Sequence, residues 1–309
     1  MARPPVIKPE RAAIVDLSHR LTALLELFPT LSKPAAKKTR EDLAQLMESV
    51  RGAAGDLDPI KDPGISFDPG NPSTTGRLVA LALLAQDRIP LERIGRTYGS
   101  GIYAIYYDGA HPLYAPLVGT ETPIYVGKAD PEVFDAVSPR EQGPQLWGRL
   151  HDHRKAIRTV EHYAIEHSLT LRLAVSEFTC RRLVCATNAQ LVAEKHLIGL
   201  FRPIWNNETK KCWGISKHGD AAKTRRNKRS PWDVIHPGRK WAMAEKLVNA
   251  AEPDVIKTRV ASHFGENPPY ADRDAIINTF LASFRQDVGL ISIEESLLED
   301  ADGERSPEK

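Results

Sequence analysis

The sequence is poor in cysteine. Cys180, Cys185 and Cys212 are the only three among 309 residues, and none of them forms a CxxC pair. An odd count without such pairs or a matching histidine spacing argues against both a disulfide framework and a zinc site. We therefore expect the protein to work in a reducing cytoplasm.

The sequence also lacks long apolar runs and a strong net charge. Its longest apolar run, residues 78–85, is far shorter than the ~20 residues that a membrane helix needs. Residues 1–10 contain prolines and charges but no apolar signal core, so we expect a soluble chain with no membrane partner. The net charge is only +2, so evidence for a nucleic-acid partner has to come from local basic clusters.

Apolar spacing and composition divide the chain into three parts. Residues 1–60 should form a helical hairpin that extends the N-terminus, and residues 61–250 the main domain. Residues 251–309 should form a helical segment that ends in an acidic tail, predicted to be disordered. In the hairpin, the first helix is predicted to end at Pro29, and the second to run from near Thr39 to a cap at Gly52.

The main domain contains three predicted strands. The aromatic segment Gly101–Tyr107 (GIYAIYY) and residues 123–127 (PIYVG) predict two of them, and the alternation in residues 169–178 predicts a third. Helices are predicted over residues 146–159 and 188–200. The expected fold is α/β of the α+β type, with a small, mainly antiparallel three-stranded sheet flanked by helices.

Two tripeptides and four polar residues follow one another in a distinctive order. The order is Gly101-Ile102-Tyr103, Tyr125-Val126-Gly127, Arg149, His153, Glu194 and Asn206. It resembles the order found in GIY-YIG nucleases, with Val126 in place of isoleucine, and the resemblance covers residues 67–242. Within that superfamily, residues 201–206 (FRPIWN) and 230–242 (SPWDVIHPGRKWA) most closely resemble the restriction enzymes that cut CCGCGG.

Hydrolysis of a phosphodiester needs an activated water, charge neutralisation at the pentavalent phosphorus, and help for the leaving 3′ oxygen. Arg149 can neutralise the charge because a guanidinium is always charged and fits phosphate oxygens bidentately. Arg149 and His153 are one helical turn apart, so both side chains can face one cleft. Each residue alone would be explained more simply as packing or solvated surface, but their joint order favours catalysis.

Glu194 is the candidate metal ligand. It is expected on an apolar helical stripe, three residues after Leu191 and four before Ile198. A carboxylate on such a face is costly unless it is paired or bound to metal, and one hard oxygen ligand suits Mg²⁺. We therefore expect Mg²⁺ at Glu194, with Mn²⁺ able to substitute. The alternative is a structural ion pair with Arg149 or Arg202.

The resemblance implies that Tyr103 is the general base. Its ordinary pKa of about 10 is poorly suited to that role at neutral pH. Nearby positive charge must therefore lower the pKa, or His153 must relay the proton. Lys128, which follows the second motif, is a further source of charge, and Tyr125 and Asn206 are expected to orient water and phosphate.

A basic segment follows Asn206. Between Glu208 and Arg229, eight Lys and Arg residues stand against two acids. Such a cluster is ordinarily a solvated loop, but its place directly after the candidate site makes phosphate or base contact an equal alternative. The residues predicted to bind DNA are Lys210, Lys211, Lys217, Arg225, Arg226 and Arg229.

The leading hypothesis is a type II restriction endonuclease that hydrolyses double-stranded DNA at a short palindrome. A homodimer is expected because two-fold symmetry matches a palindrome. A cognate DNA methyltransferase is implied as its functional partner in a bacterial cytoplasm. The alternatives are a GIY-YIG repair or homing nuclease and a non-catalytic DNA-binding module. No added module for DNA is recognisable, and the complete set of polar residues argues against a non-catalytic protein.

Overall fold

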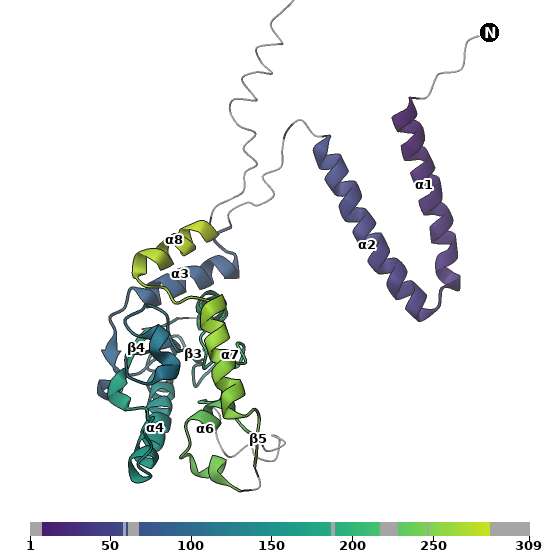
Figure 1. Ribbon diagram of the computed structural model, residues 1–309. Helices are drawn as coiled ribbons and strands as arrows, with labels where there is room; N and C mark the ends of the chain where they lie inside the picture. The colour runs from purple at the N-terminus through teal and green to yellow at the C-terminus, as the bar shows by residue number, and fades with distance from the viewer. Residues whose placement is uncertain are drawn as a thin grey trace, which may run out of the picture. The chain divides into compact units, whose positions relative to one another are not determined.

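The computed structural model describes residues 8–57, 60, 68–186, 189–216, 228–245 and 247–284. The chain divides into two compact units, residues 1–66 with 286–309 and residues 67–285. Figure 1 shows the helices and strands of both units. In the described part of the chain, no helix is long and apolar enough to cross a membrane.

The first unit contains a pair of helices, α1 (Pro9–Leu27) and α2 (Lys33–Asp56), joined through the 3-10 turn η1 (Phe28–Thr30). This confirms the N-terminal helical extension. The predicted start and end of α2 were wrong, because Ser32 caps the helix by accepting a hydrogen bond from the Ala35 amide at 3.4 Å. The helix then continues through Gly52. Neither helix buries a residue, so the hairpin has no core of its own.

The second unit is built on a four-stranded sheet. Its order is β1 (Ile89–Pro90), β4 (Phe178–Val184), β2 (Gly101–Tyr107) and β3 (Tyr125–Ala129). All three pairings are antiparallel. This confirms the α+β fold with an antiparallel sheet, to which β1 adds a short edge strand.

The third strand lies later in the chain than predicted. Residues 169–178 do not form it; the strand begins at Phe178, after the 3-10 turn η4 (Val175–Glu177). The Glu177 carboxylate holds that turn by accepting a hydrogen bond from the Ala174 amide at 3.0 Å. Leu173 and Val175 are buried in the core on the side of α4, so the apolar alternation reflects loop packing and not a strand.

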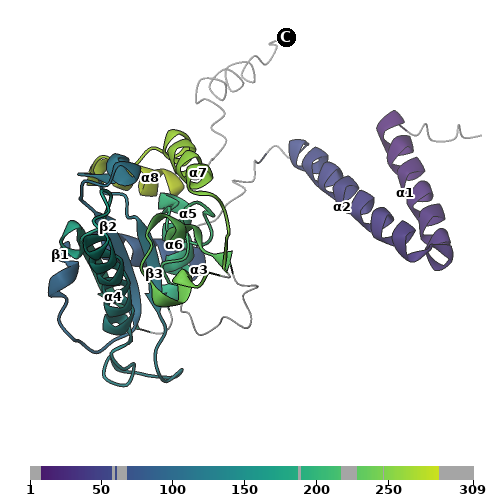
Figure 2. The same cartoon turned by 60° about the horizontal axis from the view of Figure 1, so that its bottom comes forward.

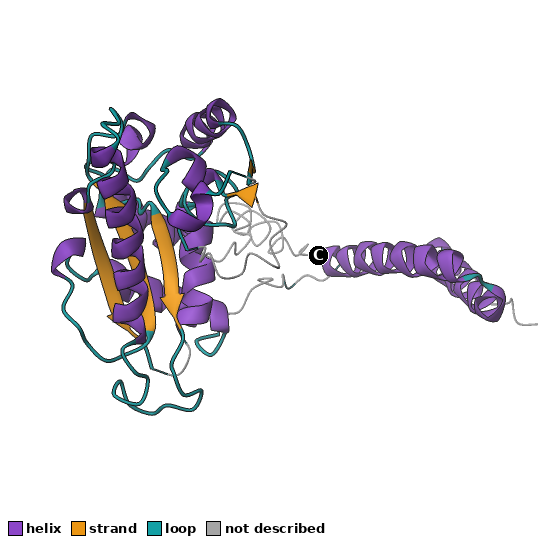
Figure 3. Cartoon of the chain, turned by 90° about the horizontal axis from the view of Figure 1, so that it is seen from below, coloured by secondary structure: helices purple, strands orange, loops and turns teal. Residues whose placement is uncertain are grey.

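Strand β2 is buried along its whole length, on both faces of the sheet. Tyr103, Ile105 and Tyr107 join one core cluster with α4 (Gln145–Glu166). Ile102, Ala104 and Tyr106 join a second cluster with α3 (Pro72–Leu84), α5 (Gln190–Phe201) and α8 (Arg273–Ser283). Figure 3 shows the strands lying between helices on both sides.

Residues after 200 complete both cores. The short helix α6 (Pro231–Ile235) places Trp232, and α7 (Pro253–Glu266) places Ile256 and Val260, in the cluster on the side of α4. Helix α8 packs in the cluster on the other face (Figure 2). Both α7 and α8 therefore belong to the same compact unit as the sheet, although apolar spacing had divided the chain at residue 250. The acidic tail lies outside the described residues.

A buried arginine ties β4 to the loop before β3. Arg181 is 1% exposed, and its Nη1 donates to Glu121 Oε2 at 2.6 Å and to the Tyr106 hydroxyl at 2.9 Å. Arg88 also pairs with Glu121, at 3.2 Å. Although burial alone would raise it, the pKa of Glu121 is held below its usual value by Arg181 and Arg88.

Removing the acid from this pair should destabilise the fold. In Glu121→Ala the Arg181 guanidinium stays buried without its carboxylate, which costs about 3–5 kcal/mol when a buried pair is broken. Chemical denaturation measures the free energy of unfolding. The matched control is Asp254→Ala, which removes the acid from the exposed Asp254–Lys257 pair and should change stability by less than ~1 kcal/mol. Equal effects in the two variants would contradict the structural role of Arg181.

Candidate active site

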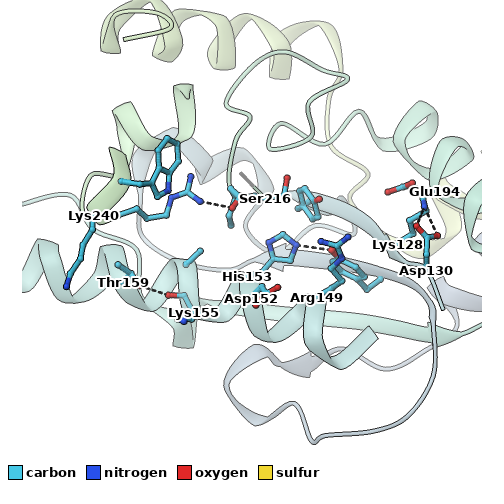
Figure 4. Close-up of a pocket in the computed structure, with 16 residues that line it drawn as sticks. Lys128, Asp130, Arg149, Asp152, His153, Lys155, Thr159, Glu194, Ser216 and Lys240 are labelled. Atoms are coloured by element: carbon cyan, nitrogen blue, oxygen red, sulfur yellow. Dashed lines mark hydrogen bonds and ion pairs between the residues drawn. The ribbon is translucent and has the colours of Figure 1, made fainter. Parts of the chain in front are cut away.

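A cleft of about 830 Å³ lies on the α4 side of the sheet. Figure 4 shows the side chains that face it. They come from β2, from β3 and the residue that follows it, from α4 and α5, and from two later segments at residues 215–216 and 239–241. The lining residues are Tyr103, Tyr125, Lys128, Asp130, Arg149, Asp152, His153, Lys155, Ala156, Thr159, Glu194, Ile215, Ser216, Arg239, Lys240 and Trp241. Six of the seven predicted catalytic residues therefore meet in one place.

Tyr103 and His153 form the centre of this cleft. The Tyr103 hydroxyl and His153 Nε2 are hydrogen-bonded at 2.8 Å, and both residues are buried. The Tyr125 ring lies 4.6 Å from the His153 ring, centroid to centroid. Arg149 precedes His153 by one helical turn on α4 and is exposed at the cleft, as expected for two residues that share a helical face.

The surroundings of Tyr103 do not favour a free phenolate. Burial raises the pKa of Tyr103 well above its ordinary value. Tyr125 and Glu194 raise it further, and Arg149 opposes them. The sequence suggested two ways for Tyr103 to act as a base: positive charge lowers its pKa, or His153 relays its proton. The raised pKa of Tyr103 shows that positive charge does not lower it here. The hydrogen bond to His153 leaves proton relay as the available route.

Close packing explains why each tripeptide contains glycine. A Cβ on Gly101 would lie 2.0 Å from the Leu183 carbonyl oxygen on β4. Gly127 pairs with Tyr103 across β2 and β3, and a Cβ there would lie 2.5 Å from the Tyr103 hydroxyl oxygen. A side chain at residue 127 would therefore displace the tyrosine from its place beside His153.

Glu194 projects from α5 into the cleft and is half-buried. Burial raises the pKa of Glu194 to about 7, and although Lys128 lowers it, Glu208 and Asp130 add to the increase. The predicted stripe was wrong, because Leu191 is 59% exposed and the buried residues of α5 are Gln190, Ala193, Leu197 and Phe201. Glu194 follows the buried Ala193 and lies at the edge of that buried face. This position still shields its carboxylate partly from water.

The nearest cations leave the charge of Glu194 poorly balanced. Lys128 donates to Asp130 Oδ1 at 2.6 Å and pairs with the same carboxylate's other oxygen. Among the described residues Glu194 takes part in no ion pair, so neither Arg149 nor Arg202 forms the structural bridge considered as the alternative. A carboxylate with a raised pKa and no balancing cation is suited to bind one.

The donor set fits a metal that is bound mainly by substrate and water. No group of three or more His, Cys, Asp or Glu side chains in the described part of the chain is arranged to hold an ion. Glu194 would therefore be the chief protein ligand. Mg²⁺ commonly binds in this way, through one or two carboxylates together with phosphate oxygens and retained waters.

Asn206 holds the backbone of β3 and does not line the cleft. Its Oδ1 accepts from the Val126 amide at 2.9 Å, and its Nδ2 donates to the Val126 carbonyl at 2.8 Å. The residue is 4% exposed. Both ends of the amide are thus used on the residue between Tyr125 and Gly127, so the geometry favours a positioning role over the predicted contact with water or phosphate.

The predicted DNA-binding residues are scattered. Lys210 and Lys211 lie in a turn after Asn206 and do not line the cleft. Arg229 is half-buried and donates to the Ala242 carbonyl at 2.7 Å, which ties strand β5 (Lys228–Arg229) to the segment at residues 239–242. Lys217, Arg225 and Arg226 lie outside the described residues.

Several residues of the cleft were not predicted. They are Asp130, Asp152, Lys155, Arg239, Lys240 and Trp241. Asp152 and Lys155 could have been suspected, because they stand three and six residues after Arg149 on the same helix. The last three lie in the segment SPWDVIHPGRKWA, where the sequence gives no sign that the chain folds back over α4.

The positioning role of Asn206 can be tested by stability. Asn206→Ala leaves the buried amide and carbonyl of Val126 without partners, at about 1–3 kcal/mol for each unsatisfied group. Asn207→Ala is the matched control, because Asn207 is the exposed neighbour and should change stability by no more than ~0.5 kcal/mol. Chemical denaturation compares the two. Unchanged stability in Asn206→Ala would instead favour direct contact with the substrate.

The environment of Glu194 predicts a pH-dependent stability in metal-free protein. Its folded pKa of about 7 lies above the value of about 4.3 expected in the unfolded chain. The free energy of unfolding therefore falls as pH rises from about 4 through 7, where the unfolded chain loses a proton that the folded state retains. Glu194→Gln removes this loss, so its advantage over wild type should grow across that range in denaturation with EDTA. A difference that does not depend on pH would contradict the burial effect.

Comparison with known proteins agrees with this geometry. No curated protein matches the chain. A family model, the Eco29kI GIY-YIG domain, matches residues 95–264, which is more than half of the 309 residues. The match includes both tripeptides and every lining residue of the cleft. The chain therefore belongs to the family of the Eco29kI GIY-YIG domain and is a GIY-YIG nuclease.

Proposed function

We propose that the protein is a type II restriction endonuclease that hydrolyses double-stranded DNA at a short palindrome, CCGCGG. The observation that carries this proposal is the convergence of Arg149, the Tyr103–His153 hydrogen bond and Glu194 on one cleft. The family match supports nuclease activity. The choice of CCGCGG rests on the resemblance of residues 201–206 and 230–242 to enzymes with that specificity.

Arg149 would bind the scissile phosphate. It is exposed at the cleft and one helical turn from His153. A guanidinium can hold two phosphate oxygens at once, and its charge offsets the negative charge that grows as water attacks phosphorus. Its contribution should therefore be greater in the transition state than in the bound substrate.

Tyr103 and His153 would activate the water together. The Tyr103 hydroxyl accepts a proton from the attacking water as its own proton passes to His153 Nε2, across the 2.8 Å hydrogen bond. Neutral His153 with an unprotonated Nε2 is the form that can accept this proton. The relay needs no stable phenolate, which the buried position of Tyr103 disfavours.

Glu194 would hold Mg²⁺, or Mn²⁺ in its place. The ion supplies Lewis-acid stabilisation of the phosphate and of the leaving 3′ oxygen when it is bound. Glu194 supplies a carboxylate whose charge the protein itself leaves poorly balanced. Lys128 donates to Asp130. Its positive charge therefore partly offsets the repulsion between the carboxylates of Asp130 and Glu194.

A palindromic site is cut most simply by a two-fold symmetric homodimer with one active site for each strand. We include this dimer in the proposal, together with a cognate DNA methyltransferase that protects the host sequence. A repair or homing nuclease is the alternative function within the family. It differs from the proposal in what it would do to undamaged plasmid DNA.

Cleavage of plasmid DNA tests the proposal. Wild type with Mg²⁺ should give discrete fragments, and sequencing of their ends should show CCGCGG. Glu194→Gln should bind DNA but not cut it. Tyr103→Phe should slow single-turnover cleavage by about 10²–10⁴-fold, and Arg149→Ala by about 10²–10³-fold. Tyr98→Phe, which changes an exposed tyrosine outside the cleft, is the matched control and should cut at the wild-type rate.

The same assay separates the alternatives. Nicking that is restricted to damaged DNA would favour a repair nuclease, and binding of plasmid DNA without any cutting would contradict the proposed activity. Full Mg²⁺-dependent activity in Glu194→Gln would contradict the metal site without contradicting nuclease activity. Fragment ends at another sequence would reject CCGCGG alone.

A further inference from the structure

The cleft extends beyond the residues of the proposed chemistry. Along α4 its lining runs from Arg149 through His153 and Ala156 to Thr159, in steps that keep these residues on one helical face. Ten residues of helix span about 15 Å. That length is roughly four base pairs of rise along a DNA strand, at about 3.4 Å for each pair. The cleft can therefore hold more of the DNA backbone than one phosphate.

The two ends of the cleft differ in charge. Glu194 and Asp130 lie at one end, and Lys155 and Lys240 lie on the other side of His153, as the close-up in Figure 4 shows. Lys128 pairs with Asp130, but Lys155 and Lys240 have no acidic partner within the described chain. Asp152 also lines the cleft, but among the described residues it forms no ion pair with either lysine, so the end away from Glu194 presents two unpaired lysines.

Lys240 is held in place by the residue before it. Arg239 is buried, and its Nε donates to Asp233 Oδ1 at 2.7 Å. Its Nη1 and Nη2 donate to the carbonyls of Ile215 at 2.9 Å and Gly214 at 2.8 Å. These bonds fix the backbone that carries Lys240 against the segment that forms another wall of the cleft.

Aromatic packing fixes the same segment from two other sides. The Arg239 guanidinium carbon lies 4.6 Å from the ring centroid of Trp232 and 5.2 Å from that of Trp241. Gly238 packs directly on α4, where a Cβ would lie 2.5 Å from the Tyr163 Cβ. The segment thus packs against α4, the helix that carries Lys155. Because these contacts already hold the backbone of Lys240, binding of a ligand there would not have to order it.

We propose that Lys155 and Lys240 form a second phosphate-binding subsite, which holds the DNA backbone beside the scissile phosphate. The inference rests on the proposed function and adds to it a place where the duplex is gripped. Contacts of this kind position DNA without selecting its sequence. Thr159 adds no donor, because its hydroxyl donates to the Lys155 carbonyl at 2.8 Å, so the two ammonium groups supply the binding charge.

The full-length double variant K155A/K240A tests the subsite. Each phosphate contact contributes about 0.9 to the slope of log affinity against log salt concentration. Loss of both contacts should reduce that slope by about 1.8 and weaken binding equally to a short duplex with CCGCGG and to a scrambled duplex. Fluorescence anisotropy of labelled duplex in EDTA measures both quantities without cleavage.

The matched control is R158A/K195A. It removes the same net charge, from an exposed residue of α4 and an exposed residue of α5 that do not line the cleft. We expect it to keep the wild-type slope. A second variant, K155R/K240R, keeps both charges and should show the wild-type slope. That result would show that the alanine variant lost its slope through lost charge and not through misfolding.

The outcomes separate the subsite from the function on which it rests. A reduced slope in K155A/K240A, with normal slopes in the control and in K155R/K240R, supports the subsite. Equal slopes in K155A/K240A and R158A/K195A overturn it, and the proposed function stands if wild type still cuts plasmid DNA. If wild type binds neither duplex and cuts no plasmid, both the subsite and the proposed function are overturned.

Discussion

The burial of β2 on both faces is the constraint on which the rest of the nuclease domain depends. Strict alternation sends Tyr103 toward α4 and its neighbours Ile102 and Ala104 toward α3 and α5. A strand that is packed on both sides cannot shift by one residue without exchanging its two cores. The position of Tyr103 beside His153 is therefore set by the packing of the entire domain and not by a local loop.

The cleft combines acidic groups whose charged forms are disfavoured by burial with cations that face its opening. Tyr103 and Glu194 both have raised pKa values because they are removed from water. At neutral pH an approaching anionic phosphodiester therefore meets less repulsion than a fully ionised Glu194 would cause. Binding of a cation at Glu194 would release a proton, so metal affinity and pH would be linked at this site.

The sequence predicted which residues meet at the cleft better than it predicted the packing around them. Tyr103, Arg149, His153 and Glu194 could be predicted to lie together because their types and order match those of GIY-YIG nucleases, and all four line the cleft. The position of β4 could not be predicted, because its sequence contains two arginines, the buried Arg181 and the half-buried Arg182. Charged residues are not expected in a buried strand unless they are paired, and the pairing of Arg181 with Glu121 is visible only in the structure. Lys240 was missed for a similar reason, since contacts distant in sequence, those of Gly238 with α4 and of Arg239 with Gly214 and Ile215, bring it to the cleft.

The two helices that come last in the domain close opposite cores. Ile256 and Val260 of α7 complete the cluster beside α4, while Ile276 and Phe280 of α8 complete the one beside α3 and α5. Domains generally fold as units during synthesis, and neither core of this sheet is complete until those helices have left the ribosome. The nascent chain therefore cannot complete the packing behind its cleft early, so a DNA-cutting activity would arise only when synthesis of the domain is almost finished.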